Sequence, residues 1–141
     1  MSADLTRARG LLAQGEYTVV LCRGDVTHTD TRRGVAPLLA LLDSGTDVGG
    51  FSAADKVVGK GAAFLYLRLG VAAVYAPVMS EGAYDLLVSH GVAVTCDIRV
   101  PAIRNRAGDG TCPMEQAVAG ITDPVEAEVA IRKRLAQLTA R

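Results

Sequence analysis

The residues best suited to chemistry gather in two short segments of the chain. The first, residues 54–60, carries two of the three lysines, Lys56 and Lys60, beside the carboxyl group of Asp55. On a helix, side chains four positions apart share a face, and the N–H groups of the first turn attract an anion. The segment therefore predicts that Asp55, Lys56 and Lys60 bind a phosphate or a carboxylate.

A structural role for the same lysines is the alternative. Their aliphatic stems would lie over the core, and their ammonium groups would pair with Asp55, Asp109 or Glu115. A phosphate loop of the Gly-x-x-x-x-Gly-Lys-Ser/Thr type is excluded, because Ala54 and Gly61 stand where that pattern needs a glycine and a hydroxyl residue.

The second segment, residues 104–115, crowds charge, glycine and a thiol into a short stretch. Asn105 and Arg106 would hold the same anion with an amide and a guanidinium. The segment also contains three groups suited to nucleophilic or acid–base work. The candidate catalytic residues are Asp109, Cys112 and Glu115.

Cys112 directly precedes Pro113, which places it at the predicted N-cap of a short helix. The helix dipole would favour a nucleophilic thiolate there. Against this, no histidine lies nearby in the sequence, Glu115 opposes a second negative charge, and free cysteines are usually buried apolar residues. Cys22 and Cys96 lie in apolar runs and are predicted to be core.

The composition limits the class of protein. The 141 residues fit one domain, 1–141, and half of them are hydrophobic. A formal net charge of zero and 4% aromatic residues argue against nucleic acid as a partner, and the pair Arg32–Arg33 is interpreted as a solvated face. Nothing resembles a signal peptide or a membrane span, and the three scattered cysteines argue against a disulfide framework, so a cytoplasmic protein is expected.

Hydrophobic periodicity predicts a layered α/β fold. Helices are expected over residues 3–13, 35–43, 52–68, 80–90 and 113–119 and from Asp123 onward, and strands over residues 17–22, 26–30, 71–76 and 92–96. The Ser52-x-x-Asp55 spacing of a capping box marks the start of the long helix. The first two strands should form an antiparallel hairpin and the last two a parallel pair. The result is a three-layer mixed β-sheet flanked by helices.

This order of elements resembles the cytidine-deaminase-like fold. Residues 54–60 and 105–115 are, in addition, similar to the signature of the uncharacterised family catalogued as domain of unknown function 1893, and the similarity covers residues 11–120. The resemblance implies a deaminase-like fold that lacks the zinc site of the deaminases. Fold alone assigns no activity.

The residues agree with the loss of zinc that the resemblance implies. Zinc deaminases use His-x-Glu at the start of the core helix and Pro-Cys-x-x-Cys at the start of the next. Here the corresponding positions read Asp55-Lys56-Val57 and Pro77-Val78-Met79-Ser80-Glu81, which supply no histidine or thiolate. No metal and no cofactor are therefore expected.

Three hypotheses for function follow. In the first, the protein binds a nucleotide-like or another anionic small molecule in a cleft where both polar segments converge. In the second, it is a metal-independent enzyme that acts on a nucleotide-like substrate through Cys112, Asp109 or Lys56. In the third, the polar cluster only braces the interface of a homo-oligomer, a hypothesis that the absence of a pocket would favour.

Overall fold

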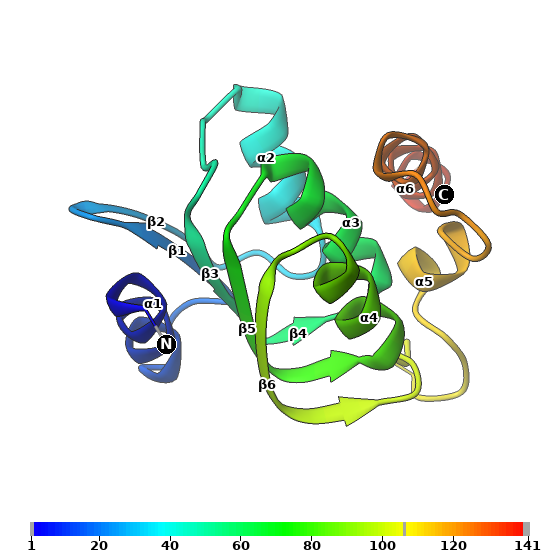
Figure 1. Cartoon of the computed structure of the whole chain (residues 1–141). Helices are drawn as coiled ribbons and strands as arrows, with labels where there is room; N and C mark the ends of the chain where they lie inside the picture. Colours follow the sequence, from blue (N-terminus) through cyan, green and yellow to red (C-terminus); the bar gives the residue numbers. More distant parts are fainter. Residues whose placement is uncertain (1, 106, 140–141) are drawn as a thin grey trace.

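A mixed six-stranded sheet between helices organises the chain. The computed structural model describes residues 2–105 and 107–139. The helices are α1 (Ala3–Ala13), α2 (Ala36–Ser44), α3 (Lys60–Leu69), α4 (Glu81–Ser89), α5 (Pro113–Ala117) and α6 (Pro124–Thr139) (Figure 1). The strands are β1 (Val19–Arg23), β2 (Val26–Asp30), β3 (Ser52–Asp55), β4 (Val57–Val58), β5 (Ala73–Ser80) and β6 (Ala93–Val100).

The strand pairing confirms both predicted pairs. β1 is antiparallel to β2, and β5 is parallel to β6. β1 also pairs antiparallel with β3, while β5 pairs parallel with β3 and with β4. Because β6 runs along one side of β5, the short strands β3 and β4 share its other side, one after the other. The mixed sheet flanked by helices is thus confirmed.

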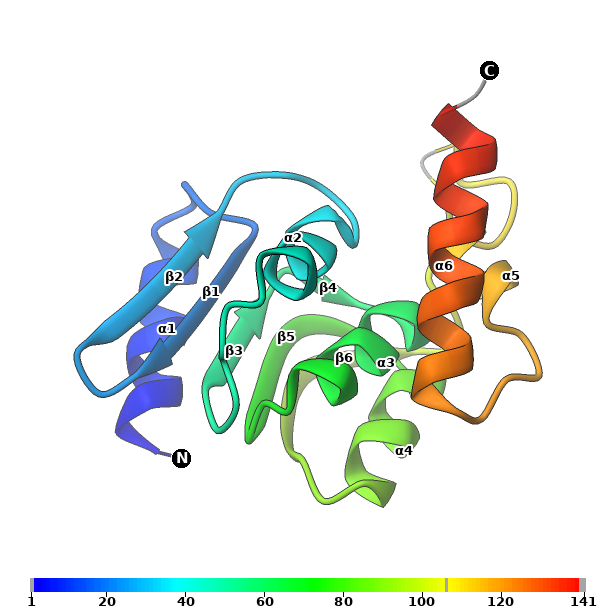
Figure 2. The same cartoon turned by 90° about the horizontal axis from the view of Figure 1, so that it is seen from above.

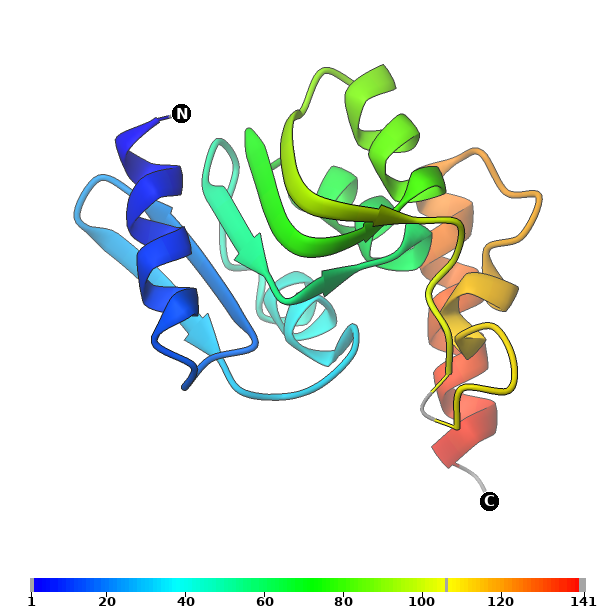
Figure 3. The same cartoon turned by 90° about the horizontal axis from the view of Figure 1, so that it is seen from below.

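Helices cover both faces of the sheet (Figures 2 and 3). On one face α1 buries Leu5, Ala8 and Leu12 against β1, β3 and β5, and Cys22 lies in this core as predicted. On the other face α2, α3 and α4 pack on the sheet, and α5 and α6 pack behind α3. Among the described residues, no helix is long and apolar enough to cross a membrane.

The predicted helix over residues 52–68 is wrong in its first half. Residues 52–55 form β3, in the middle of the sheet between β1 and β5. Ala53 faces the α3 side and Ala54 the α1 side, and both are fully buried. Small residues suit a strand that is covered by helices on both faces, and this tertiary setting outweighs the helical preference of alanine.

The prediction that Lys56 and Lys60 share a helix face is wrong for the same reason. Lys56 is exposed between β3 and β4, where the strand is interrupted, and α3 begins only at Lys60 with Gly59 as its N-cap. Ser52 therefore caps no helix. Its hydroxyl oxygen lies in the sheet, 3.5 Å from that of Ser2.

The last two strands run further than expected. β5 continues to Ser80 and β6 to Val100, past the predicted ends at residues 76 and 96. In β5 the predicted end comes just before Pro77, because a proline cannot donate to the ladder and usually ends a central strand. Here the register passes from Ala76 directly to Val78, so the ladder skips the proline and resumes.

Candidate functional site

The sheet divides where β3 ends, and a cavity of about 630 Å³ lies there. β1 and β3 pair as far as Val19 and Asp55, and the Lys56 N–H donates to the Thr18 carbonyl oxygen at 3.2 Å. Beyond that point the chain leaves β1 and follows β5 as β4. The cavity therefore sits at the carboxyl end of a parallel strand, the usual place of ligand crevices in open α/β sheets.

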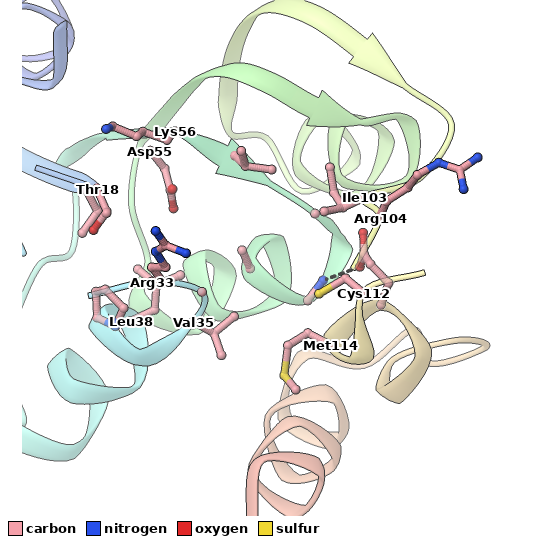
Figure 4. A pocket seen from close by; sticks show the side chains of 18 of the residues that line it. Thr18, Arg33, Val35, Leu38, Asp55, Lys56, Ile103, Arg104, Cys112 and Met114 are labelled. Atoms are coloured by element: carbon pink, nitrogen blue, oxygen red, sulfur yellow. Dashed lines mark hydrogen bonds between the residues drawn. The ribbon is translucent and has the colours of Figure 1, made fainter. Parts of the chain in front are cut away.

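Three stretches of the chain wall the cavity (Figure 4). They are the two ends of the hairpin with the start of α2, the link from β3 to α3, and the segment before and within α5. The residues that line the cavity include Thr18, Thr31, Arg33, Val35, Leu38, Asp55, Lys56, Gly59, Ile103, Arg104, Cys112, Met114 and Glu115.

Asp55 points into the cavity from the end of β3 (Figure 4). One of its carboxyl oxygens, Oδ2, accepts a hydrogen bond of 2.7 Å from the hydroxyl of Tyr66, which is fully buried in α3. Burial raises the pKa of Asp55 to about 7, although the Tyr66 hydroxyl and the N–H groups of Val57 and Lys56 favour the charged form. Burial and the Asp55 carboxyl also raise the pKa of Tyr66 well above its ordinary value. Asp55 is thus a carboxyl that can change its charge near neutral pH.

Glu115 closes the N-terminus of α3. Its two carboxylate oxygens accept hydrogen bonds from the N–H groups of Lys60 at 2.9 Å and Gly61 at 3.1 Å. A Cβ at Gly59 would collide with this carboxylate, and a Cβ at Gly61 would lie 3.2 Å from Met114 Cβ. The two glycines therefore let the α5 segment approach, and the predicted anion position at this helix end is held by a carboxylate of the chain itself.

The cysteine of the second segment lines the cavity, and its polar loop does not. Cys112 lines the cavity and is the N-cap residue of α5, without a side-chain hydrogen bond to the helix. Asn105 and Asp109 do not line it. The Asn105 amide donates to Asp109 Oδ1 at 2.9 Å, and Asp109 N–H donates to Asn105 Oδ1 at 3.3 Å, which closes an exposed loop. Arg106, the remaining predicted ligand residue, lies outside the described residues.

The cations near the cavity differ in direction. Lys56 and Arg104 stand at its margin with their charged ends turned away from its centre, whereas the guanidinium of Arg33 points toward the Asp55 side of the space (Figure 4). Lys60 does not line the cavity, and its ammonium group lies 5.7 Å from the centre of the Phe64 ring.

Arg33 is the functional candidate that the sequence interpretation missed. Arg32 and Arg33 are both exposed, in agreement with the predicted solvated face, and Arg32 forms an ion pair of 2.6 Å with Asp30. Arg33 follows β2 by only a few residues, and β2 ends level with Asp55 across β1, because Val19 pairs with Asp30 on one side and with Asp55 on the other. The position of Arg33 just after the hairpin could have indicated its role. Recognising this required the strand β3, and the sequence interpretation predicted a helix there.

The side chains of residues 2–105 and 107–139 bring no group of three or more His, Cys, Asp or Glu residues together in a way that could hold a metal ion.

Comparisons with known proteins give a family and a fold. The family model described as TM1506, domain of unknown function (DUF1893), matches residues 7–135. The crystal structure of a DUF1893 family protein, TM1506 from Thermotoga maritima, is similar, with a TM-score of 0.83 and 25% sequence identity over 97% of this chain and 92% of that chain. No curated protein matches the sequence.

Proposed function

Because the chain belongs to this family of unknown function, DUF1893, we propose its function from the cavity at Asp55: the protein binds a small anionic molecule of nucleotide-like size. The observation that carries the proposal is a space of about 630 Å³ with the Arg33 guanidinium directed into it. Pockets of roughly 300–1,000 Å³ are typical for small-molecule ligands.

The character of the walls supports this proposal. The lining of the cavity is more apolar than polar, and Val35, Leu38 and Met114 are among the apolar residues that line it. A few polar groups, chiefly Arg33 and Asp55, would fix its orientation. This combination of an apolar lining with few convergent polar groups is the usual composition of a binding pocket.

We further propose that the fold is cytidine-deaminase-like and that the cavity takes the place of its cleft. The order of the hairpin, the core helix α3, β5, α4 and the parallel strand β6 supports this proposal. The element order predicted from the sequence had no strand directly before the core helix, and β3 is an additional strand there.

The enzyme hypothesis is less well supported. Of its residues, Cys112 and Lys56 line the cavity, but Asp109 is bonded to Asn105 in the exposed loop. Both carboxylate oxygens of Glu115 accept backbone N–H groups of α3, which gives this side chain a structural role. The third hypothesis, a cluster that only braces a homo-oligomer, would be favoured by the absence of a pocket, and the cavity of about 630 Å³ lends it no support.

Replacing Arg33 by methionine is expected to weaken binding of an anionic ligand by about tenfold or more, because a charge-assisted hydrogen bond contributes about 1.5–3 kcal/mol. The measurement is thermal unfolding of the wild type and the variant with nucleoside monophosphates and other phosphorylated metabolites. A ligand at about a hundred times its dissociation constant stabilises the folded state by about 2.7 kcal/mol.

Arg32→Met is the matched control, since Arg32 adjoins Arg33 but faces Asp30 on the surface and does not line this cavity. Its ligand response should equal that of the wild type. If no anion of the panel stabilises the wild type, the proposed function is wrong.

A further inference from the structure

Two side chains of opposite charge are directed into the same cavity. Asp55 enters from the end of β3, and Arg33 enters from the segment that joins β2 to α2 (Figure 4). They do not form an ion pair with each other, although four such pairs join other described residues. Each is therefore available to a molecule that occupies the space.

The Asp55 carboxyl is held in place and still has room for a ligand. Tyr66, which is fully buried, fixes Oδ2 with a hydrogen bond of 2.7 Å, and the N–H groups of Lys56 and Val57 approach the same carboxyl. An ionised carboxylate accepts about four hydrogen bonds, and the Lys56 N–H also donates to the Thr18 carbonyl oxygen, so the bond from Tyr66 leaves acceptor capacity on this carboxyl. A group held in this way loses little freedom on binding.

We infer that the ligand carries an N–H donor group in addition to its anionic group, and that Asp55 accepts the hydrogen bond from the donor while Arg33 pairs with the anion. This inference rests on the proposed function and specifies the ligand that it leaves open. Asp55 is then the residue that distinguishes a donor-bearing anion, such as a nucleotide with its base, from a plain phosphorylated sugar.

The charge of Asp55 is compatible with an anion close by. Its pKa of about 7 means that the carboxyl holds a proton in a large share of the molecules near neutral pH, which reduces repulsion of a negative ligand. In either form it offers an oxygen to an N–H donor. A permanently charged carboxylate at the same place would oppose the anion that Arg33 attracts.

The experiment compares ligands that share an anion and differ in the donor. The four common nucleoside 5′-monophosphates and ribose 5-phosphate are titrated into the wild type, Asp55→Asn and Asp97→Asn, with affinity read by calorimetry. Asp97 is the matched control, because it also accepts a hydrogen bond from a tyrosine, Tyr75 at 2.6 Å, but does not line this cavity.

The wild type should bind at least one monophosphate about tenfold more tightly than ribose 5-phosphate. Asp55→Asn should remove that preference without weakening ribose 5-phosphate binding, because the amide oxygen takes the hydrogen bond from Tyr66 and the amide NH2, which is only a donor, is left for the cavity side. Asp97→Asn should keep both the preference and the affinity. The inference is overturned if an anion binds and depends on Arg33 but Asp55→Asn leaves the preference intact, or if the wild type has no preference. If no ligand of the panel binds to the wild type, both this inference and the proposed function are wrong.

Discussion

Asp55→Asn is expected to make the protein more stable than the wild type above about pH 7. The pKa of Asp55 is raised from 3.8 to about 7 in the folded state, with burial as the main cause. Between these values the folded protein holds a proton that the unfolded chain has released, so the free energy of unfolding falls as the pH rises through this window. At about 1.4 kcal/mol for each pKa unit, the free energy of unfolding of the wild type falls by roughly 4 kcal/mol in total by the time the pH is above 7.

The measurement is urea unfolding of both proteins at several values between about pH 4 and about pH 8. The difference in free energy should be small at the acid end and should grow in favour of Asp55→Asn up to about neutral pH. Asp97→Asn makes the same carboxyl-to-amide change at an exposed residue outside the cavity and is measured beside it. A wild type and Asp55→Asn that differ by a constant amount at every pH would contradict the assignment.

Gly59→Ala is expected to destabilise the protein through Glu115 and not through its own backbone. The backbone of Gly59 is extended, with φ −99°, which alanine adopts without strain. Its Cβ would collide with the Glu115 carboxylate and would lie 3.0 Å from Ile103 Cγ1. We expect a loss of about 1–3 kcal/mol, because the N–H groups of Lys60 and Gly61 lose their acceptor.

A double-mutant cycle tests this mechanism. Glu115→Ala alone should cost about 1–2 kcal/mol, and adding Gly59→Ala to it should cost much less than in the wild type, because the same contact cannot be lost twice. Gly10→Ala is the control, since a Cβ there meets nothing within 4 Å and alanine in the middle of α1 should stabilise by about 0.5–1 kcal/mol. Strictly additive losses at Gly59 and Glu115 would show that the two residues act independently.

The outer parts of the fold were predictable because their patterns are local. The hairpin of β1 and β2 shows a β-branched apolar run followed by an alternating one, and α6 begins at Asp123-Pro124, where Asp123 Oδ2 accepts from the Glu126 N–H. The parallel pair of β5 and β6 followed from a strand, a helix and a strand in succession. These patterns involve residues that are close together in the sequence, so contacts with distant parts of the chain do not change the structures that they predict.

The region from β3 to α3 was not predictable because its structure depends on distant partners. Ser52 and Asp55 have the spacing of a capping box, and alanine is a good helix former, so local preference favours a helix. Pairing with β1 and β5 makes the segment a strand instead. The same error placed Lys60 in the candidate site and left Arg33 out, since only the real end of β3 shows which side chains surround Asp55.

The hydrogen bonds between Glu115 and the first turn of α3 can form only late in the synthesis of the chain. During synthesis the chain leaves the ribosome from its N-terminus, and Lys60 emerges 55 positions before Glu115. Until the later residues follow, α3 has free N–H groups at its first turn, and the cavity lacks the wall formed by Ile103, Cys112 and Met114. A nascent chain therefore has the residues of the whole sheet before it has this wall, and the cavity is complete only after residues 103–115 have been made.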